Sequence, residues 1–489
     1  MRITNSMTGK KEEFIPIEEG KVKMYACGIT AYDLSHIGHA RQAIVYEMMT
    51  NYLRYKGYDV TYVRNYTDVD DKIINKANEL GKNALEFSKE QIIETENDMN
   101  ALHVKNADIT VKASEYIGKI ISFIEKLIEK GNAYVANNGD VYFSVRTFKE
   151  YGKLSHRSID DMINGVRIEV GEEKKDPIDF ALWKSAKEGE IFWDSPWGKG
   201  RPGWHIECSA MILDTLGENI DIHGGGRDLL FPHHENEIAQ SEALTGKKFV
   251  NYWTHCGLLK INGEKMSKSL GNSLTIRDAL ANYNYEVIKY VILSKHYASD
   301  MDIIDYDYKL AEKQMYYFYN TIKLMKQFIK NNKIADNTKI LENEIVNSII
   351  EKFEDAMDDD FNTISAIANL HTIFKFANGL MKDNKGNDKS EFANTLNRIL
   401  TDVKKVYSIL GLFEQEPEEF ITDIKQRYLL KLNINIDYIE SQIEKRANSK
   451  LKKNFQEADK IREELDEKGI ILNDTKYGTT WDIKVLFQI

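Results

Sequence analysis

The first strongly patterned part of the chain lies between residues 21 and 67. Residues 21–29 form a short apolar run that predicts a buried strand. Apolar residues then recur at helical spacing from about Ile37 to Tyr55, and Ser35 precedes them as a candidate helix cap. Residues 59–65 alternate in polarity and predict a second strand. This strand–helix–strand order predicts an α/β fold that begins a doubly wound parallel sheet of the Rossmann type.

The remaining pattern predicts further domains after this sheet. Residues 72–135 read as largely helical, and residues 141–200 mix short strands with loops. A helical pattern dominates from about residue 305, and one long charged helix is expected at about 437–468. The length of 489 residues is too great for one hydrophobic core. We therefore expect an α/β domain at 1–305 with a connecting insertion at about 115–200, an all-α domain at 306–415, and a small mixed domain at 420–489.

Composition and charge restrict the class of protein. Hydrophobic residues make up 42% and charged residues 29%, as in globular proteins that fold in water. The polar N-terminal residues do not resemble a signal peptide, and no apolar run could span a bilayer. We therefore expect a cytoplasmic protein without a membrane partner. The net charge of −11 argues against non-specific coating of nucleic acid, but it leaves room for a local basic patch.

Two short motifs carry candidate nucleotide chemistry. His36-Ile37-Gly38-His39 lies where the first strand leads into the first helix, a position that favours phosphate binding. Gly38 leaves room for a flat ring, and the two histidines can donate hydrogen bonds to a phosphoryl oxygen. Lys265-Met266-Ser267-Lys268-Ser269 follows a predicted hairpin at 258–261 with an Asn262-Gly263 turn. Each motif alone occurs by chance, whereas the pair in this order is specific.

The two motifs resemble the HIGH and KMSKS signatures of class I aminoacyl-tRNA synthetases. The resemblance implies a Rossmann-type catalytic domain that joins an amino acid to ATP, supplied as Mg-ATP, releases pyrophosphate and passes the acyl group to tRNA. It assigns catalysis to His36, His39, Lys265 and Lys268. It assigns ATP binding to Gly28, Gly38, His36, His39 and Lys268.

A set of distant cysteine, histidine and glutamate residues suggests a metal site. The three cysteines are odd in number and widely spaced, which argues against a disulfide framework. Cys27 ends the first strand, and Cys208 lies in what reads as a loop entering a helix. His233 and Glu237 share one face of a predicted helix. Two thiolates, an imidazole and a carboxylate are a ligand set that suits zinc.

Each of these residues also has a simpler interpretation. A lone cysteine is most often a buried small hydrophobic residue, and His-His-Glu is often only a polar helix start. A zinc protease is a sharper alternative, since His234-Glu235 begins the motif H-E-x-x-H. Ile238 stands where that motif needs its second histidine, so the motif fails.

Three stretches narrow the resemblance to one family. Residues 25–30, 203–208 and 221–237 resemble the cysteinyl-tRNA synthetase family. By that resemblance one zinc ion per chain is bound by Cys27, Cys208, His233 and Glu237, while Thr67 and Trp204 line the amino-acid pocket. Cys256 matches no ligand position. Zinc would select the thiolate of cysteine over the hydroxyl of serine by about 10⁴–10⁵, whereas shape alone reaches only about 10².

The C-terminal half carries weaker similarity to the same family. Residues 357–363, 458–462 and 469–481 resemble blocks of its helical and anticodon-binding regions. The resemblance makes 306–415 a stem-contacting, DALR-like domain and 420–489 an anticodon-binding domain. A basic run without acidic residues and a possible stacking ring supply the candidate tRNA contacts Lys450, Lys452, Lys453 and Trp481. The implied partners are L-cysteine, ATP and tRNA-Cys, and we expect a monomer.

Two other readings compete with this one. A ligase that gives cysteine to an amino sugar, as in mycothiol biosynthesis, resembles the catalytic half but lacks the C-terminal unit present at 420–489. A zinc-bearing RNA-binding protein with an inactive synthetase fold would usually have lost a signature histidine or lysine, and none is missing here. Cysteine-dependent pyrophosphate exchange separates an enzyme from a binding protein, and a tRNA acceptor assay separates the two enzymes.

Overall fold

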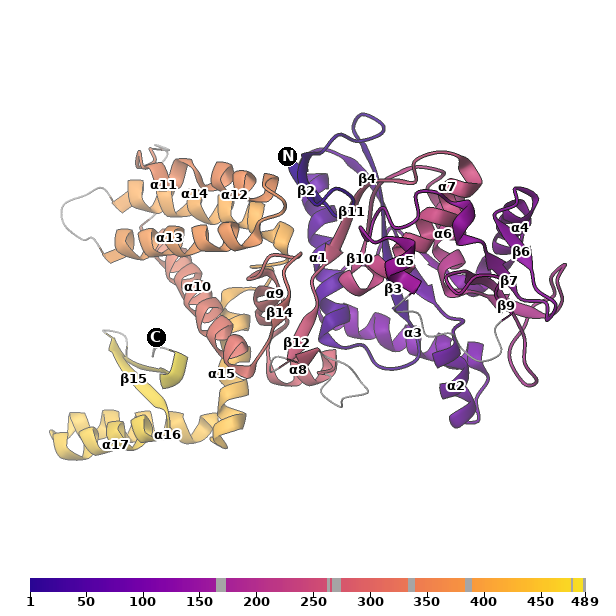
Figure 1. The fold of residues 1–489 in the computed structure, drawn as a ribbon. Coiled ribbons are helices and arrows are strands. Elements are labelled where there is room, and N and C mark those ends of the chain that lie inside the picture. Colours follow the sequence, from indigo (N-terminus) through magenta and orange to yellow (C-terminus); the bar gives the residue numbers. More distant parts are fainter. Residues whose placement is uncertain are drawn as a thin grey trace. The chain divides into compact units, whose positions relative to one another are not determined.

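The computed structural model describes residues 1–163, 173–261, 264–265, 274–332, 339–382, 389–475 and 478–486, with the backbone alone at 161, 163, 261 and 264–265. They form two compact units (Figure 1). The first comprises Met1–Ile276, Lys295–Ile303 and Asp355–Thr363, and the second comprises Arg277–Ser294, Ile304–Glu354 and Ile364–Ile489. Neither unit is one continuous stretch of chain. No helix among the described residues is long and apolar enough to cross a membrane.

A parallel sheet of five strands forms the centre of the first unit. Its order is β11-β10-β3-β4-β5, and every neighbouring pair is parallel. The strands are β3 (Lys21–Thr30), β4 (Asp59–Thr67), β5 (Ile109–Lys112), β10 (Ile220–Gly226) and β11 (Val250–Cys256). This confirms the predicted α/β fold, although the edge strand β5 was not anticipated. The chain runs outward from β3 to one side and later from β10 to the other, so a ligand crevice is expected at the carboxyl ends of β3 and β10.

Helices and a smaller sheet surround this centre. The helix α1 (Ile37–Tyr55) joins β3 to β4, as predicted. An antiparallel sheet of the order β6-β7-β8-β9 fills the expected insertion and leads directly into α6. The other elements of this part are β1 (Arg2–Asn5), β2 (Lys10–Glu13), α2 (Asp71–Glu79), α3 (Ala84–Ala101), α4 (Ile117–Glu129), β6 (Ala133–Val135), β7 (Val141–Phe143), α5 (Ile159–Ile163), β8 (Phe180–Ser185), β9 (Gly200–Pro202), α6 (Trp204–Thr215), the π-helical turn η4 (Leu230–His234), α7 (Glu235–Thr245), β12 (Leu259–Ile261), β13 (Glu264–Lys265) and β14 (Met301–Asp302).

The start of α1 differs from the prediction in its cap. Ser35 is not the N-cap, because its hydroxyl lies 3.1 Å from that of Thr95. The N-cap is His36, whose ring accepts from the His39 N–H while the His39 ring accepts from the His36 N–H. This reciprocal arrangement satisfies two amide groups that a helix start leaves without partners. It also stacks the two imidazole rings with their centroids 3.7 Å apart.

A segment from far along the chain completes the first unit. The carboxylate of Asp360 accepts hydrogen bonds from the Thr4 amide at 2.8 Å and from the Tyr297 hydroxyl at 2.8 Å. Asp360 and Phe361 have φ values of 66° and 52°, a left-handed conformation that costs free energy in non-glycine residues. The hydrogen bonds of Asp360 and the complete burial of Phe361 offset that cost.

The second unit is helical and ends in a two-stranded sheet. Its elements are α8 (Ile276–Asn282), α9 (Tyr285–Leu293), α10 (Asp305–Asn331), α11 (Glu344–Asn347), α12 (Ile349–Asp358), α13 (Thr363–Lys382), α14 (Lys389–Tyr407), α15 (Pro417–Leu432), α16 (Ile436–Leu451), α17 (Phe455–Glu467), β15 (Ile470–Thr475) and β16 (Gly478–Ile483). The buried carboxylate of Glu286 accepts from the Tyr319 hydroxyl and from the Phe413 amide, which ties α9, α10 and the segment before α15 together.

The prediction of a single long helix at 437–468 is wrong. The chain forms two separate helices, α16 and α17, with a break at residues 452–454. Lys453 has φ 60°, which no α-helix accommodates, and the Asn454 side chain caps α17 by accepting from the Glu457 amide. The continuous charge pattern hid this break, although Asn454 and Glu457 form the N-x-x-E pattern of a helix start.

Candidate active site

A cavity of about 320 Å³ opens at the carboxyl ends of the central strands, where the strand order predicts a ligand crevice. It lies within the first unit. Most of the residues singled out from sequence line it, and these are Cys27, Gly28, His36, Gly38, His39, Thr67, Trp204, Cys208 and His233. The fold therefore brings the nucleotide motif and the predicted metal ligands to one place.

Close backbone packing at two glycines, Gly28 and Gly203, sets the position of the cavity wall around them. A Cβ atom on Gly28 would lie 1.5 Å from the carbonyl oxygen of Asn65, so only glycine lets β3 approach β4 at this point. A Cβ atom on Gly203 would lie 2.0 Å from the carbonyl oxygen of Ala181. Gly203 is the N-cap residue of α6, and its fit against β8 sets the position of Trp204 at the start of that helix.

The four predicted metal ligands converge on one buried point. Potential ligand atoms of Cys27, Cys208, His233 and Glu237 all lie within 4.8 Å of one another. The two sulfur atoms are 3.9 Å apart, and His233 Nε2 lies 2.9 Å from Glu237 Oε1. The stretch that reads as a loop entering a helix does so at Gly203, and Cys208 lies inside α6. These side chains come from the sheet strand β3 and from α6, η4 and α7, and apolar side chains of α6 and α7 pack on the sheet.

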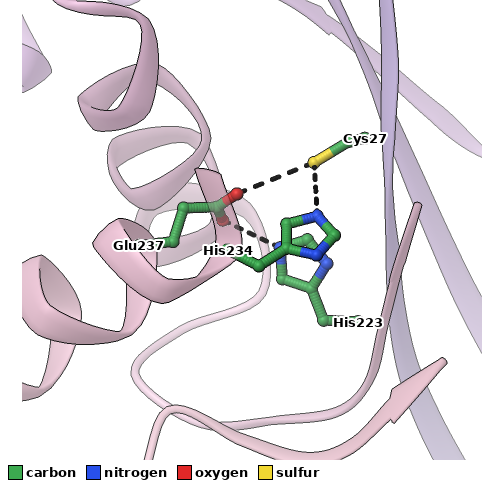
Figure 2. Close-up of side chains that lie close together, drawn as sticks. All are labelled: Cys27, His223, His234 and Glu237. Atoms are coloured by element: carbon green, nitrogen blue, oxygen red, sulfur yellow. Dashed lines mark hydrogen bonds and ion pairs between the residues drawn. The ribbon is translucent and has the colours of Figure 1, made fainter. Parts of the chain in front are cut away.

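Two further histidines contact this group. His223 Nε2 lies 2.8 Å from Glu237 Oε2, and His234 Nε2 lies 3.3 Å from Cys27 Sγ (Figure 2). Together with Cys27 and Glu237 they make a second set whose ligand atoms lie within 4.8 Å of one another. Sequence reasoning gave neither histidine a role. Both lie in the stretch 221–237, but spacing along one chain does not show which histidines face the same point.

The buried charges stabilise one another. Burial alone would raise the pKa of Glu237, but His223 and His233 lower it to about 2. Burial alone would lower the pKa of His233, but the Glu237 carboxylate and Cys208 raise it to about 10. The hydrogen bond with Cys27 lowers the pKa of Cys208 to about 6 against the effect of burial. Burial and the hydrogen bond with Cys208 raise the pKa of Cys27 in turn, so within this group Glu237 and Cys208 carry the negative charge that suits a cation.

The dimensions of the group fit a zinc ion. Zinc binds thiolate sulfur at about 2.3 Å, so two sulfur ligands of a tetrahedral ion lie about 3.8 Å apart. The observed separation of 3.9 Å agrees with that value and far exceeds a disulfide bond. Cys27, Cys208 and His233 line the cavity whereas His223 and His234 do not. Three members of the first set line the cavity, against Cys27 alone of the second, so an ion on the first set would be the more open to a ligand in the cavity.

The nucleotide motifs are described in part. His36, Gly38 and His39 line the cavity at the start of α1. The strand pairing of the predicted hairpin is confirmed, since β12 pairs with β13 through Lys260 and Lys265. The predicted Asn262-Gly263 turn lies outside the described residues. Lys268 lies outside the described residues, as does the side chain of Lys265, so their roles stay predictions. The guanidinium of Arg41, two residues after the motif, donates to the carbonyl oxygens of Gly257 and Ser299 and so fixes the base of this hairpin.

The candidate tRNA contacts lie in the second unit, and they differ in whether their side chains already contact other protein groups. Lys450 Nζ lies 3.0 Å from Asp474, which also binds the buried Arg446 through both of its oxygens. Lys452 and Lys453 are exposed at the break between α16 and α17. The Lys425 ammonium lies 4.6 Å from the centre of the half-buried Trp481 ring.

Comparison with known proteins gives consistent results. Residues 13–313 match the family model of the tRNA synthetases class I (C) catalytic domain, and residues 352–414 match that of the DALR domain. A cysteine–tRNA ligase of Geobacter metallireducens is 48% identical over 99% of this chain and 100% of its own length. The cysteine–tRNA ligase of Thermodesulfovibrio yellowstonii is also 48% identical, with the same coverage.

The structural comparison agrees at the level of the fold. A methionyl-tRNA synthetase of Mycobacterium tuberculosis, solved with methionyl-adenylate, superposes with a TM-score of 0.60 over 82% of this chain and 95% of its own, at 15% identity. This similarity supports the class I fold alone. The sequence relatives, which match end to end, resolve the family within that class. The chain belongs to the cysteine–tRNA ligase family of class I tRNA synthetases.

Proposed function

We propose that this chain activates L-cysteine with ATP, releases pyrophosphate, and transfers the cysteine to the 3′ end of tRNA-Cys. One observation supports this proposal most strongly: the thiolate-rich ligand group and the histidine motif line the same cavity. A cavity with both features has room for an amino acid on one side and a phosphate on the other. The full-length match to cysteine–tRNA ligases gives independent support.

The zinc ligands in this proposal are Cys27, Cys208, His233 and Glu237. Zinc bound there would hold the substrate sulfur as a thiolate and reject the hydroxyl of serine. His223 and His234 orient Glu237 and Cys27 through the contacts described above, as residues around metal ligands commonly do. Thr67 and Trp204 contact the rest of the amino acid.

The remaining residues act on the nucleotide. His36 and His39 donate hydrogen bonds to the phosphate where charge develops, and Gly28 and Gly38 let the nucleotide approach the backbone. Lys265 and Lys268 stabilise the departing pyrophosphate. The segments 306–415 and 420–489 bind the tRNA, with Lys450, Lys452, Lys453 and Trp481 as contacts, and the protein acts as a cytoplasmic monomer.

Pyrophosphate exchange tests the first half of the reaction. Purified protein with ATP should exchange labelled pyrophosphate in the presence of cysteine and not of serine. An acceptor assay with tRNA-Cys and with the amino sugar of mycothiol biosynthesis tests the second half. Exchange with serine, or transfer to the amino sugar alone, would contradict the proposal.

A further inference from the structure

The hydroxyl of Thr67 takes part in a chain of hydrogen bonds at the cavity wall. Thr67 ends β4 and lines the cavity together with Asn65. Its oxygen lies 3.4 Å from Asn65 Nδ2 and 3.1 Å from Glu207 Oε2. Glu207 is fully buried in α6 and does not line the cavity. No role follows for Asn65 or Glu207 from the activity proposed above.

A backbone amide fixes the direction of these hydrogen bonds. The Gly28 N–H donates to Asn65 Oδ1 at 2.8 Å. A backbone amide can only donate, so the oxygen of the Asn65 side chain faces Gly28 and its NH₂ group faces Thr67. The Thr67 oxygen therefore accepts from Asn65, and its single proton is donated to Glu207. The three bonds run in one direction, from Gly28 to Glu207.

This direction determines what Thr67 offers to a ligand. A hydroxyl group has one proton to donate and two lone pairs that accept. The hydroxyl proton is donated in the hydrogen bond to Glu207, and one lone pair accepts the hydrogen bond from Asn65. One lone pair remains, and it can only accept a hydrogen bond. An amino acid with its sulfur at the metal ligands presents an ammonium group, which only donates, and a carboxylate, which only accepts. Thr67 in this state selects the ammonium group.

We propose that Asn65 and Glu207 are positioning residues that make Thr67 an acceptor for the α-ammonium group of the substrate. The inference rests on the proposed function, since it takes a thiol-bearing amino acid as the occupant of the cavity. The Oε1 atom of Glu207 has no hydrogen-bond partner within the described ranges, so Thr67 is the one hydrogen-bond donor that those residues supply to this carboxyl group.

The test reverses the direction of the chain. In Glu207→Gln the new amide can donate to Thr67, which would turn the Thr67 proton toward the ammonium group. Affinity for L-cysteine should fall about 10- to 100-fold, as expected when a hydrogen bond to a charged group is lost. The affinity for cysteamine, which has the thiol and the ammonium group, should fall by the same factor. 3-Mercaptopropionate, which has the thiol and the carboxylate, should change by less than about twofold. Quenching of tryptophan fluorescence measures all three, with zinc content as a check.

Matched variants separate this role from a structural one. Thr67→Val should give the same pattern as Glu207→Gln, and Thr67→Ser should retain cysteine affinity. This pair decides the matter even if Glu207→Gln fails to fold. Glu242→Gln makes the same change on α7, where Glu242 pairs with Lys153 outside the cavity, and should leave all three affinities unchanged.

The outcomes also separate the inference from the proposed function. Equal weakening of all three ligands in Glu207→Gln and Thr67→Val, or no weakening at all, would overturn the positioning role while the function stands. A wild-type protein that binds none of the thiols would overturn the proposed function, and the inference with it.

Discussion

At the scale of single residues, the candidate site depends on which thiol and imidazole groups share a point in space. The three cysteines are all buried, and all three line the cavity: Cys27, Cys208 and Cys256. Among the described residues, only the first two belong to a group of potential ligands. Burial raises the pKa of Cys27 and Cys256 alike, so the absence of neighbouring ligand atoms in the described part of the chain, and not the pKa of its thiol, sets Cys256 apart.

This difference gives the first prediction. Cys208→Ser should lower the zinc content from close to one ion per chain and raise the KM for cysteine, with the KM for ATP less affected. Cys256→Ser is the matched control, since it changes a buried thiol in the same cavity, and it should keep its zinc. Metal analysis and exchange kinetics measure both. Full zinc occupancy with normal cysteine affinity in Cys208→Ser would sink the ligand assignment.

The second prediction concerns the lysine motif. Lys268→Ala should slow adenylate formation by about 10²–10³, because one preorganised contact to the transition state is lost while cysteine binding is kept. His39→Ala should behave similarly. Lys260→Ala removes a lysine from the same hairpin that lies 3.5 Å from Asp300, and should leave the rate unchanged. A Lys268→Ala protein with the wild-type exchange rate would mean that the motif is coincidental.

At the scale of elements, the periodicity of the sequence predicts what is locally encoded. The helix from Ile37 to Tyr55 and the strands on either side were predicted because their apolar residues repeat at a clear period. The His36 cap, the break at Lys453 and the strand β5 were missed because each depends on only one to four residues. His223 and His234 were missed because their roles depend on contacts between different elements.

The third prediction tests how α6 is placed. Gly203→Ala would put a Cβ atom 2.0 Å from the carbonyl oxygen of Ala181, so the start of α6 must shift. We expect a loss of about 1–3 kcal/mol in stability and a raised KM for cysteine, since Trp204 and Cys208 move with the helix. Gly118→Ala in α4 is the control, because a Cβ atom there meets nothing within 4 Å. It should be neutral or stabilising. Thermal unfolding and exchange kinetics decide between them.

The fourth prediction concerns Asp474 in β15. Hydrogen bonds from Arg446 and Thr479 hold the pKa of this carboxyl well below its usual range. A lowered pKa in the folded state stabilises the fold above the ordinary pKa of about 4, and that stabilisation is lost as the pH falls below it. Asp474→Asn should therefore lower the melting temperature at pH 7, and the difference should narrow toward pH 3. The loss should be on the order of 1 kcal/mol, since the side chain is 43% exposed.

At the scale of the whole molecule, the proposed activation and transfer steps are assigned to different parts of the chain. The cavity lies within the first unit, whereas the candidate tRNA contacts lie in the second. The α/β fold and the family could be predicted from the two signature motifs and the ligand set. The division into domains at 305 and 415 stays a prediction. Patterns along the chain could not show that Asp355–Thr363 packs with the first unit, because that packing joins segments far apart in the sequence.

The fifth prediction separates the two activities. A chain ended after Asn433, the residue that closes α15, should keep cysteine-dependent exchange and lose most tRNA charging. A cut near Pro417 is less suitable, because Phe420 in α15 stacks on Tyr319 with centroids 4.0 Å apart. In the full chain, Lys452 and Lys453 to Ala should weaken tRNA affinity and flatten its salt dependence. If the shortened chain charges tRNA normally, the region after Asn433 does not bind the anticodon.

The hydrogen bond between Thr4 and Asp360 has a consequence for synthesis on the ribosome. Its two residues are separated by 356 positions, so the N-terminal strand emerges long before its partner is translated. The Thr4 and Tyr297 groups that Asp360 satisfies must meanwhile remain hydrated or find other partners. A nascent chain stalled at residue 313, the limit of the matched catalytic domain, should therefore hold its first unit loosely. Protease resistance of that unit should appear only in longer nascent chains from which Asp360 has left the exit tunnel.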